Sequence, residues 1–214
     1  MKLYVYDHCP FCVRARMIFG LKNLPVEQIA LLNDDETTPV GLIGHKAVPI
    51  LIKQDGSAMP ESLDIVKYID DNFGEKLLDE HIRPEIEQWL KKVGEYNNRL
   101  VAPRYVKMDL PEFTTQSAID YFVNKKQASY GDFAENLANT QTLLAQLHED
   151  FKTLEPLILG EYASGKPSFE DIILFPILRN LTCVKGVQFP AKIAQYVENM
   201  ADLTQVNLYF SQAI

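Results

Sequence analysis

Two cysteines near the start of the chain, Cys9 and Cys12 in "YDHCPFCV", form a C-x-x-C motif. Such a pair can bind a metal, form a structural disulfide or act as a reactive redox couple. A zinc site normally needs a second pair of ligands, but Cys183 is remote and the four histidines are scattered along the chain. A structural disulfide is unusual in an intracellular protein. The motif therefore favours redox chemistry, and we expect no bound metal.

The residues around the motif predict different roles for its two sulfurs. Pro10 suits the first position of a helix, which places Cys9 at the N-cap. Free backbone N–H groups and the helix dipole favour an anion there, so the pKa of Cys9 should fall below the free value of about 8.5. Cys12 lies one turn deeper on the same face. We expect Cys9 to attack a disulfide and Cys12 to resolve the mixed disulfide that forms.

The chain changes character after Gly74. Alternating or β-branched runs predict strands at 2–6, 26–31, 48–52 and 58–59, with helices over 11–23 and 62–73. Beyond the connector "GEKLLDEHIRP" the patterning is helical, with expected helices at about 85–106, 115–126, 132–157, 169–183 and 190–203. These patterns predict an α/β domain over 1–73, a linker over 74–84 and an all-helical domain over 85–214.

Composition narrows the class of protein. Hydrophobic residues make up 47% of the 214 residues and charged residues 23%, which is typical of a soluble globular protein. No apolar run reaches the length of a membrane span. The net charge of -8 disfavours nucleic acids and anionic membranes as partners. The opening "MKLYVYDHCP" is too short for the core of a signal peptide, so we expect a cytoplasmic protein.

The order of three motifs resembles a known architecture. The cysteine pair, then Val48-Pro49, then Glu61-Ser62, resembles the thioredoxin-like module of glutaredoxins and of glutathione transferase N-terminal domains. The helical second domain resembles the glutathione transferases, including a Ser-x-x-Asp pair at Ser168 and Asp171. The whole chain thus resembles the bacterial glutaredoxins built on a glutathione-transferase fold. The resemblance implies a βαβ-ββα domain with a mixed four-stranded sheet and an all-α domain.

The same resemblance implies that glutathione is the reductant. It implies a cis Val48-Pro49 bond whose exposed backbone edge holds the cysteinyl part of glutathione. Ser62, at a helix N-terminus, would hold the γ-glutamyl carboxylate, and Glu61 the γ-glutamyl amine. Plainer interpretations are a trans proline and a Ser62 that only caps its helix. The expected partners are protein disulfides and glutathionylated proteins.

Departures from the family pattern leave two alternatives open. Phe11 stands where many glutaredoxins have tyrosine, and "CPF" also resembles the omega-class transferases and the chloride-intracellular-channel proteins. The chain could therefore be a glutathione transferase or dehydroascorbate reductase that uses Cys9 alone. It could also be a non-enzymatic, redox-sensitive interaction protein. Cys12 favours the dithiol oxidoreductase. His8 could assist proton transfer or be an exposed turn residue with no special role.

Overall fold

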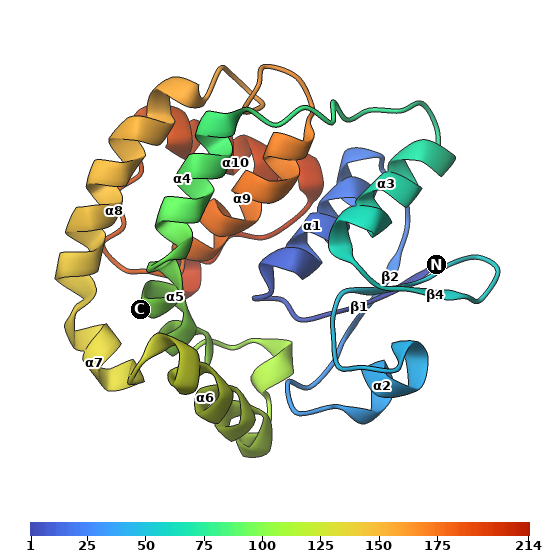
Figure 1. Ribbon diagram of the computed structural model, residues 1–214, viewed down its shortest axis with the longest axis horizontal. Helices are drawn as coiled ribbons and strands as arrows, with labels where there is room; N and C mark the ends of the chain where they lie inside the picture. Colours follow the sequence, from blue (N-terminus) through green and yellow to red (C-terminus); the bar gives the residue numbers. More distant parts are fainter.

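The first part of the protein is a four-stranded sheet covered by helices on both faces (Figure 1). The computed structural model describes residues 1–214. The strand order is β2-β1-β3-β4, with β1 parallel to β2 and the remaining neighbours antiparallel. Helices α1 and α3 lie on one face and α2 on the other. In chain order the elements are β1 (Lys2–Val5), α1 (Pro10–Leu21), β2 (Glu27–Ala30), α2 (Thr37–Ile43), β3 (Ile50–Ile52), β4 (Ala58–Met59) and α3 (Ser62–Asn72).

Apolar periodicity explains how β1 delivers the cysteine motif to α1. Leu3 and Val5 alternate into the core, as a half-buried strand requires. In α1, Ala15 and Ile18 are fully buried at helical spacing. Phe11 departs from that face, because half of its surface is exposed. The sheet and α1 therefore form the rigid support on which Cys9 is placed.

The second part is entirely helical and contains shorter helices than the sequence predicts. The expected helix over 85–106 is wrong as a single element, because α4 ends at Gly94 and the next helix starts at Asn97. Between them the Tyr96 hydroxyl donates to Asp150 at 2.7 Å, which anchors the break. The expected helix over 132–157 also breaks, at Asn139. The helices are α4 (Pro84–Gly94), α5 (Asn97–Tyr105), α6 (Gln116–Tyr130), α7 (Phe133–Ala138), α8 (Thr140–Leu154), α9 (Phe169–Leu181) and α10 (Ala191–Thr204), with short 3₁₀ turns η1 (Pro111–Phe113), η2 (Glu155–Leu157) and η3 (Phe210–Gln212).

The two parts meet along α1, which packs against α3 on its own side and against α9 and α10 on the other (Figure 1). Residues 73–83 join them without a helix. The division into 1–73, 74–84 and 85–214 stays a prediction about folding units. At the start of α9 the Ser168 backbone N–H donates to Asp171 at 3.0 Å in a capping box. No helix is both long and apolar enough to cross a membrane.

Gly20 marks a close approach between the two parts. A Cβ built on Gly20 in α1 would lie 2.1 Å from the backbone oxygen of Thr204 in α10. We therefore expect Gly20→Ala to destabilise the protein by about 1–3 kcal/mol, since backbone must move to admit the methyl group. Gly41→Ala is the matched control, because Gly41 is also helical and a Cβ there would meet nothing within 4 Å. Urea unfolding of both variants checks the prediction, and equal stabilities would contradict it.

Candidate active site

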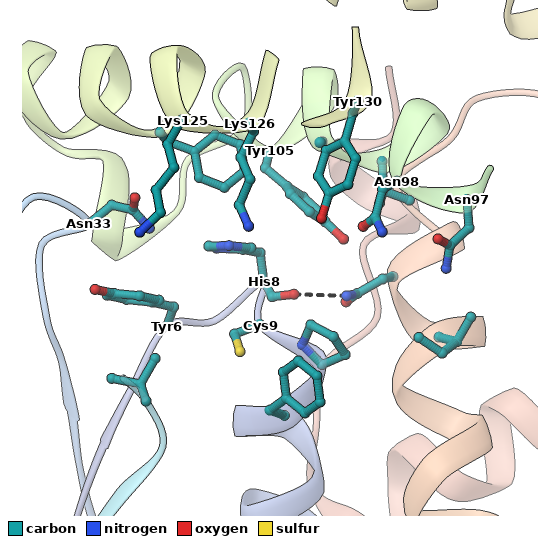
Figure 2. A pocket seen from close by; sticks show the side chains of 18 of the residues that line it. Tyr6, His8, Cys9, Asn33, Asn97, Asn98, Tyr105, Lys125, Lys126 and Tyr130 are labelled. Atoms are coloured by element: carbon teal, nitrogen blue, oxygen red, sulfur yellow. Dashed lines mark hydrogen bonds between the residues drawn. The ribbon is translucent and has the colours of Figure 1, made fainter. Parts of the chain in front are cut away.

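A cavity of about 430 Å³ lies between the two parts of the molecule, and Cys9 is in its wall (Figure 2). The sheet side contributes the β1–α1 loop, the start of α1 and the segment before β3. The helical side contributes residues of α5, α6 and α9. The size falls in the usual range of small-ligand sites. A group that approaches Cys9 must therefore enter between the β1–α1 loop and the helical wall.

Cys9 lies at the N-cap of α1 with Pro10 at the first helical position, as the sequence predicts. The pKa of its thiol is lowered to about 6. The largest cause is a hydrogen bond from the Cys12 thiol, followed by the nearby His8 and by the backbone N–H groups of Cys12 and Phe11, while burial opposes the shift. The sequence analysis predicted that the backbone amides lower this pKa, but not that the hydrogen bond from the Cys12 thiol is the larger cause. At neutral pH Cys9 is thus a thiolate.

Cys12 has the opposite character. It is fully buried, and its sulfur accepts a hydrogen bond from the Tyr6 backbone N–H at 3.4 Å. Burial raises the pKa of its thiol well above the ordinary value, and the hydrogen bond to Cys9 and the negative charge of Cys9 raise it further. Cys12 therefore keeps its proton while Cys9 carries the charge. All three cysteines of the chain are free, and Cys183 is buried away from the cavity.

His8 is held by a carboxylate from the helical part. The buried Glu112 accepts from the His8 backbone N–H at 2.9 Å and from its ring Nδ1 at 2.5 Å. Burial acts to raise the pKa of Glu112, but the hydrogen bonds and charge of His8 prevail and hold it below the usual range. The ring also packs against Tyr105, Phe113 and Phe122. The interpretation of His8 as an exposed turn residue is therefore wrong.

The β1–α1 loop is fixed by two further side chains of α9. The fully buried Arg179 donates to the Asp7 backbone oxygen at 2.7 Å and to its carboxylate at 2.9 Å. Asn180 donates to the His8 backbone oxygen at 2.8 Å, the contact drawn in Figure 2. Arg179 and Arg16, which overcome the effect of burial, hold the pKa of Asp7 well below its usual range. Asp7 and His8, in the loop that precedes Cys9, are therefore both hydrogen-bonded to α9 of the helical part.

The structure distributes the residues expected to bind glutathione over two regions. Val48 lines the cavity, and the Val48-Pro49 bond is cis, as the resemblance implies. Glu61 and Ser62 lie outside the cavity lining, at the start of α3. The expected Ser62 cap is wrong, because Glu61 occupies the N-cap with a positive φ of 69° and Ser62 is the first helical residue. No side chain caps this helix end, which leaves its N–H groups to a ligand or water.

The sequence reasoning missed Glu112, Arg179 and Asn180. Each contacts a residue more than 100 positions away, so local patterns carry no information on the partner. Only Arg179 left a signal, as a charge inside the apolar run "ILFPILRNL". No group of three or more His, Cys, Asp or Glu side chains is arranged to hold a metal ion.

Comparison with known proteins identifies the family. Residues 3–77 match the model of the glutathione S-transferase N-terminal domain, and residues 85–213 match the model of the glutaredoxin 2 C-terminal domain. Glutaredoxin 2 of Escherichia coli strain K12 is 52% identical over 215 residues, which cover 100% of both chains. The chain belongs to the glutaredoxin 2 family.

Solved structures agree with this assignment. Glutaredoxin 2 from Salmonella typhimurium in complex with glutathione is 51% identical, with a TM-score of 0.97 over 100% of this chain and 98% of that one. Glutathione transferase Omega 3C from Trametes versicolor, at 19% identity and a TM-score of 0.57, shares the fold over 97% of this chain and 84% of its own. This glutaredoxin is therefore a thiol-disulfide oxidoreductase, and its predicted glutathione-transferase-like fold is confirmed.

The hydrogen bond between the two thiols sets the pKa of Cys9 and can be tested directly. We expect Cys12→Ala to raise that pKa by roughly 1 to 2, since a hydrogen bond to a charged group contributes about 1.5–3 kcal/mol. Cys12→Ser is the matched control, because its hydroxyl can still donate. The measurement is the rate of alkylation by iodoacetamide against pH, which in the unmodified protein should be half-maximal near pH 6. An unchanged profile in Cys12→Ala would refute this account.

Proposed function

We propose that Cys9 and Cys12 are the reactive dithiol of this glutaredoxin and that glutathione regenerates it. The observation that carries the proposal is the unequal ionisation of two hydrogen-bonded thiols, of which only Cys9 lines the cavity. A thiolate is the attacking species in disulfide exchange. The ionised sulfur that lines the cavity therefore suits the first attack, and the buried, protonated sulfur suits the second.

The proposed cycle balances in sulfur, electrons and protons. The Cys9 thiolate attacks one sulfur of a substrate disulfide, forms a mixed disulfide and releases the other sulfur as a thiolate that takes up a proton. Cys12 loses its proton and attacks the Cys9 sulfur, which forms the Cys9–Cys12 disulfide and releases the second substrate thiol. Two glutathione molecules then reduce this disulfide and leave as glutathione disulfide.

The pKa of Cys12 gives this cycle its order. The charge of the Cys9 thiolate and its hydrogen bond to Cys12 both help to keep Cys12 protonated. Once Cys9 enters a mixed disulfide, that charge and the strong hydrogen bond disappear, so the Cys12 proton is easier to remove. Cys12 thus becomes a nucleophile only when there is an intermediate to resolve.

We assign glutathione to the backbone edge at Val48-Pro49 and to Glu61 and Ser62 at the start of α3. The uncapped helix end supplies N–H groups for a carboxylate, and the carboxylate of Glu61 can accept from an amine. The Salmonella relative, similar over the full chain, was solved in complex with glutathione. The proposed substrates are protein disulfides and glutathionylated proteins. The proposed compartment is the cytoplasm, where glutathione is kept reduced.

The two cysteines should respond differently to replacement. We expect Cys9→Ser to abolish turnover of a glutathionylated peptide, because no other thiol is ionised in the cavity. Cys12→Ser should keep part of that turnover, since glutathione itself can resolve the Cys9–glutathione disulfide, but it should lose reduction of protein disulfides. The measurement is a steady-state assay coupled to glutathione reductase, with Cys183→Ala as the control that retains both activities. Equal loss in the Cys9 and Cys12 variants would rule out these roles.

Ser62 provides a separate test of the glutathione site. We expect Ser62→Ala to raise the KM for glutathione by about tenfold, which corresponds to one lost hydrogen bond to a charged group. The pKa of Cys9 should stay the same, because Ser62 is not among the groups that set it. Ser211→Ala, at an exposed serine in η3, is the control for the loss of a hydroxyl. A KM equal to that of the control would remove Ser62 from the site.

A further inference from the structure

The cavity beside Cys9 carries a charge opposite to that of the whole protein. The chain has a net charge of -8, yet no Asp or Glu lines the cavity. Its charged lining residues are Arg14, Lys46, Lys125 and Lys126. A cleft lined by one sign of charge concentrates its field and attracts ligands of the other sign. The local charge therefore selects for anionic groups at the reacting sulfur.

Lys125 and Lys126 are the two lysines of this set that have no carboxylate partner. Neither takes part in any of the ion pairs of the molecule, whereas Lys46 lies 3.9 Å from Glu36 and donates to the Asn33 backbone oxygen at 2.7 Å. Each has an aromatic ring of α6 as a neighbour, and Lys125 also lies close enough to Lys46 for the two charges to interact. Both ammonium groups therefore keep their hydrogen-bonding capacity for a ligand.

The two lysines extend into the cavity from the helical side. In Figure 2 Lys126 extends from α6 toward His8 and Lys125 toward Asn33, while Cys9 lies on the opposite wall. The proposed glutathione contacts, at Val48-Pro49 and at the start of α3, belong to the sheet side. The α6 wall is thus left for the other half of the disulfide, whose sulfur departs in line with Cys9 and the attacked glutathione sulfur.

The placement of the lysines also favours one kind of anion. Adjacent residues of a helix do not face each other, and here Lys125 lies near Tyr121 whereas Lys126 lies near Phe122 and Tyr130. The two charges are therefore spread along the wall instead of converging on one point. This arrangement suits two separate carboxylates, while a single phosphate is better held by a convergent or bidentate group.

We propose that Lys125 and Lys126 form a specificity site for acidic peptide segments, so that the enzyme prefers disulfides whose cysteine is flanked by Asp or Glu. The proposal rests on the function proposed above and names its substrate class. The lysines are specificity residues, because they contact the peptide and not the reacting sulfur atoms. The preference should be strongest at low ionic strength, since it arises from exposed charges.

The test uses three glutathionylated peptides of one length that differ only in the residues flanking the cysteine, which are Glu, Gln or Lys. The measurement is kcat/KM for release of the peptide thiol by the full-length enzyme. We expect the Glu peptide to exceed the Gln peptide by roughly five- to tenfold, because two exposed ion pairs contribute modestly. The Lys peptide should be the poorest substrate, and high salt should reduce all the differences.

Paired variants assign the preference to the α6 wall. In Lys125→Gln/Lys126→Gln the ratio of Glu to Gln peptide should fall close to one. Lys185→Gln/Lys192→Gln is the matched control, because it removes the same charge at two exposed lysines outside the cavity and should keep the ratio. Loss of the ratio in both variants would mean that net charge alone is responsible and would overturn the assignment to α6.

Two other outcomes would also overturn the inference. Wild-type enzyme that turns over all three peptides equally would show no acidic preference, while the proposed dithiol function would stand. A rise in KM for glutathione in Lys125→Gln/Lys126→Gln, with the peptide ratio intact, would assign the lysines to glutathione instead. If no peptide is turned over at all, the proposed function itself fails, which is a result distinct from a lost preference.

Discussion

The position of the Cys9 sulfur depends on the buried contact between Arg179 and the Asp7 loop. Arg179 is completely buried, and such a charge is costly unless it is paired and fully hydrogen-bonded. Its donors reach the Asp7 carboxylate and carbonyl, the Asn207 carbonyl and the Tyr209 hydroxyl. The Arg179 guanidinium also packs 3.7 Å from the centre of the Tyr209 ring. Because the charges of Arg179 and Asp7 are paired and hydrogen-bonded, this contact stabilises a single position of the loop.

The contact between Arg179 and the Asp7 loop also affects the pKa of Cys9. The loop held at Asp7 and His8 leads directly into the first turn of α1, where the donors to Cys9 are located. A displacement of the loop would change the distance between Cys9 and the Cys12 thiol, on which the low pKa chiefly depends. The helical part contributes no cysteine to the cavity, but through Glu112, Arg179 and Asn180 it helps to determine where the Cys9 sulfur lies. The second domain is therefore part of the active site in a geometric sense.

Local sequence signals predicted the elements that carry the site but not the contacts that hold it. The strand–helix junction at Cys9 follows from Pro10 and a change of apolar period, both of which act over a few residues. The cis bond at Val48-Pro49 could be expected only from the resemblance to a family. The breaks near Tyr96 and Asn139 were missed, because neither follows from the apolar period and the first depends on a hydroxyl that reaches Asp150 in another helix. Contacts such as His8 with Glu112 join residues that only the finished fold brings together.

The cationic cavity links the ionisation of Cys9 to the choice of substrate. Positive charge around the cavity favours the Cys9 thiolate, and the same field attracts anionic ligands. These two effects oppose each other at close range, because a carboxylate brought next to a thiolate repels it. The proposed specificity site at Lys125 and Lys126 would reduce this conflict, since these lysines are on the wall opposite Cys9 and would hold a carboxylate away from the sulfur. An acidic substrate bound in the proposed way would therefore keep its carboxylates at a distance from the Cys9 thiolate.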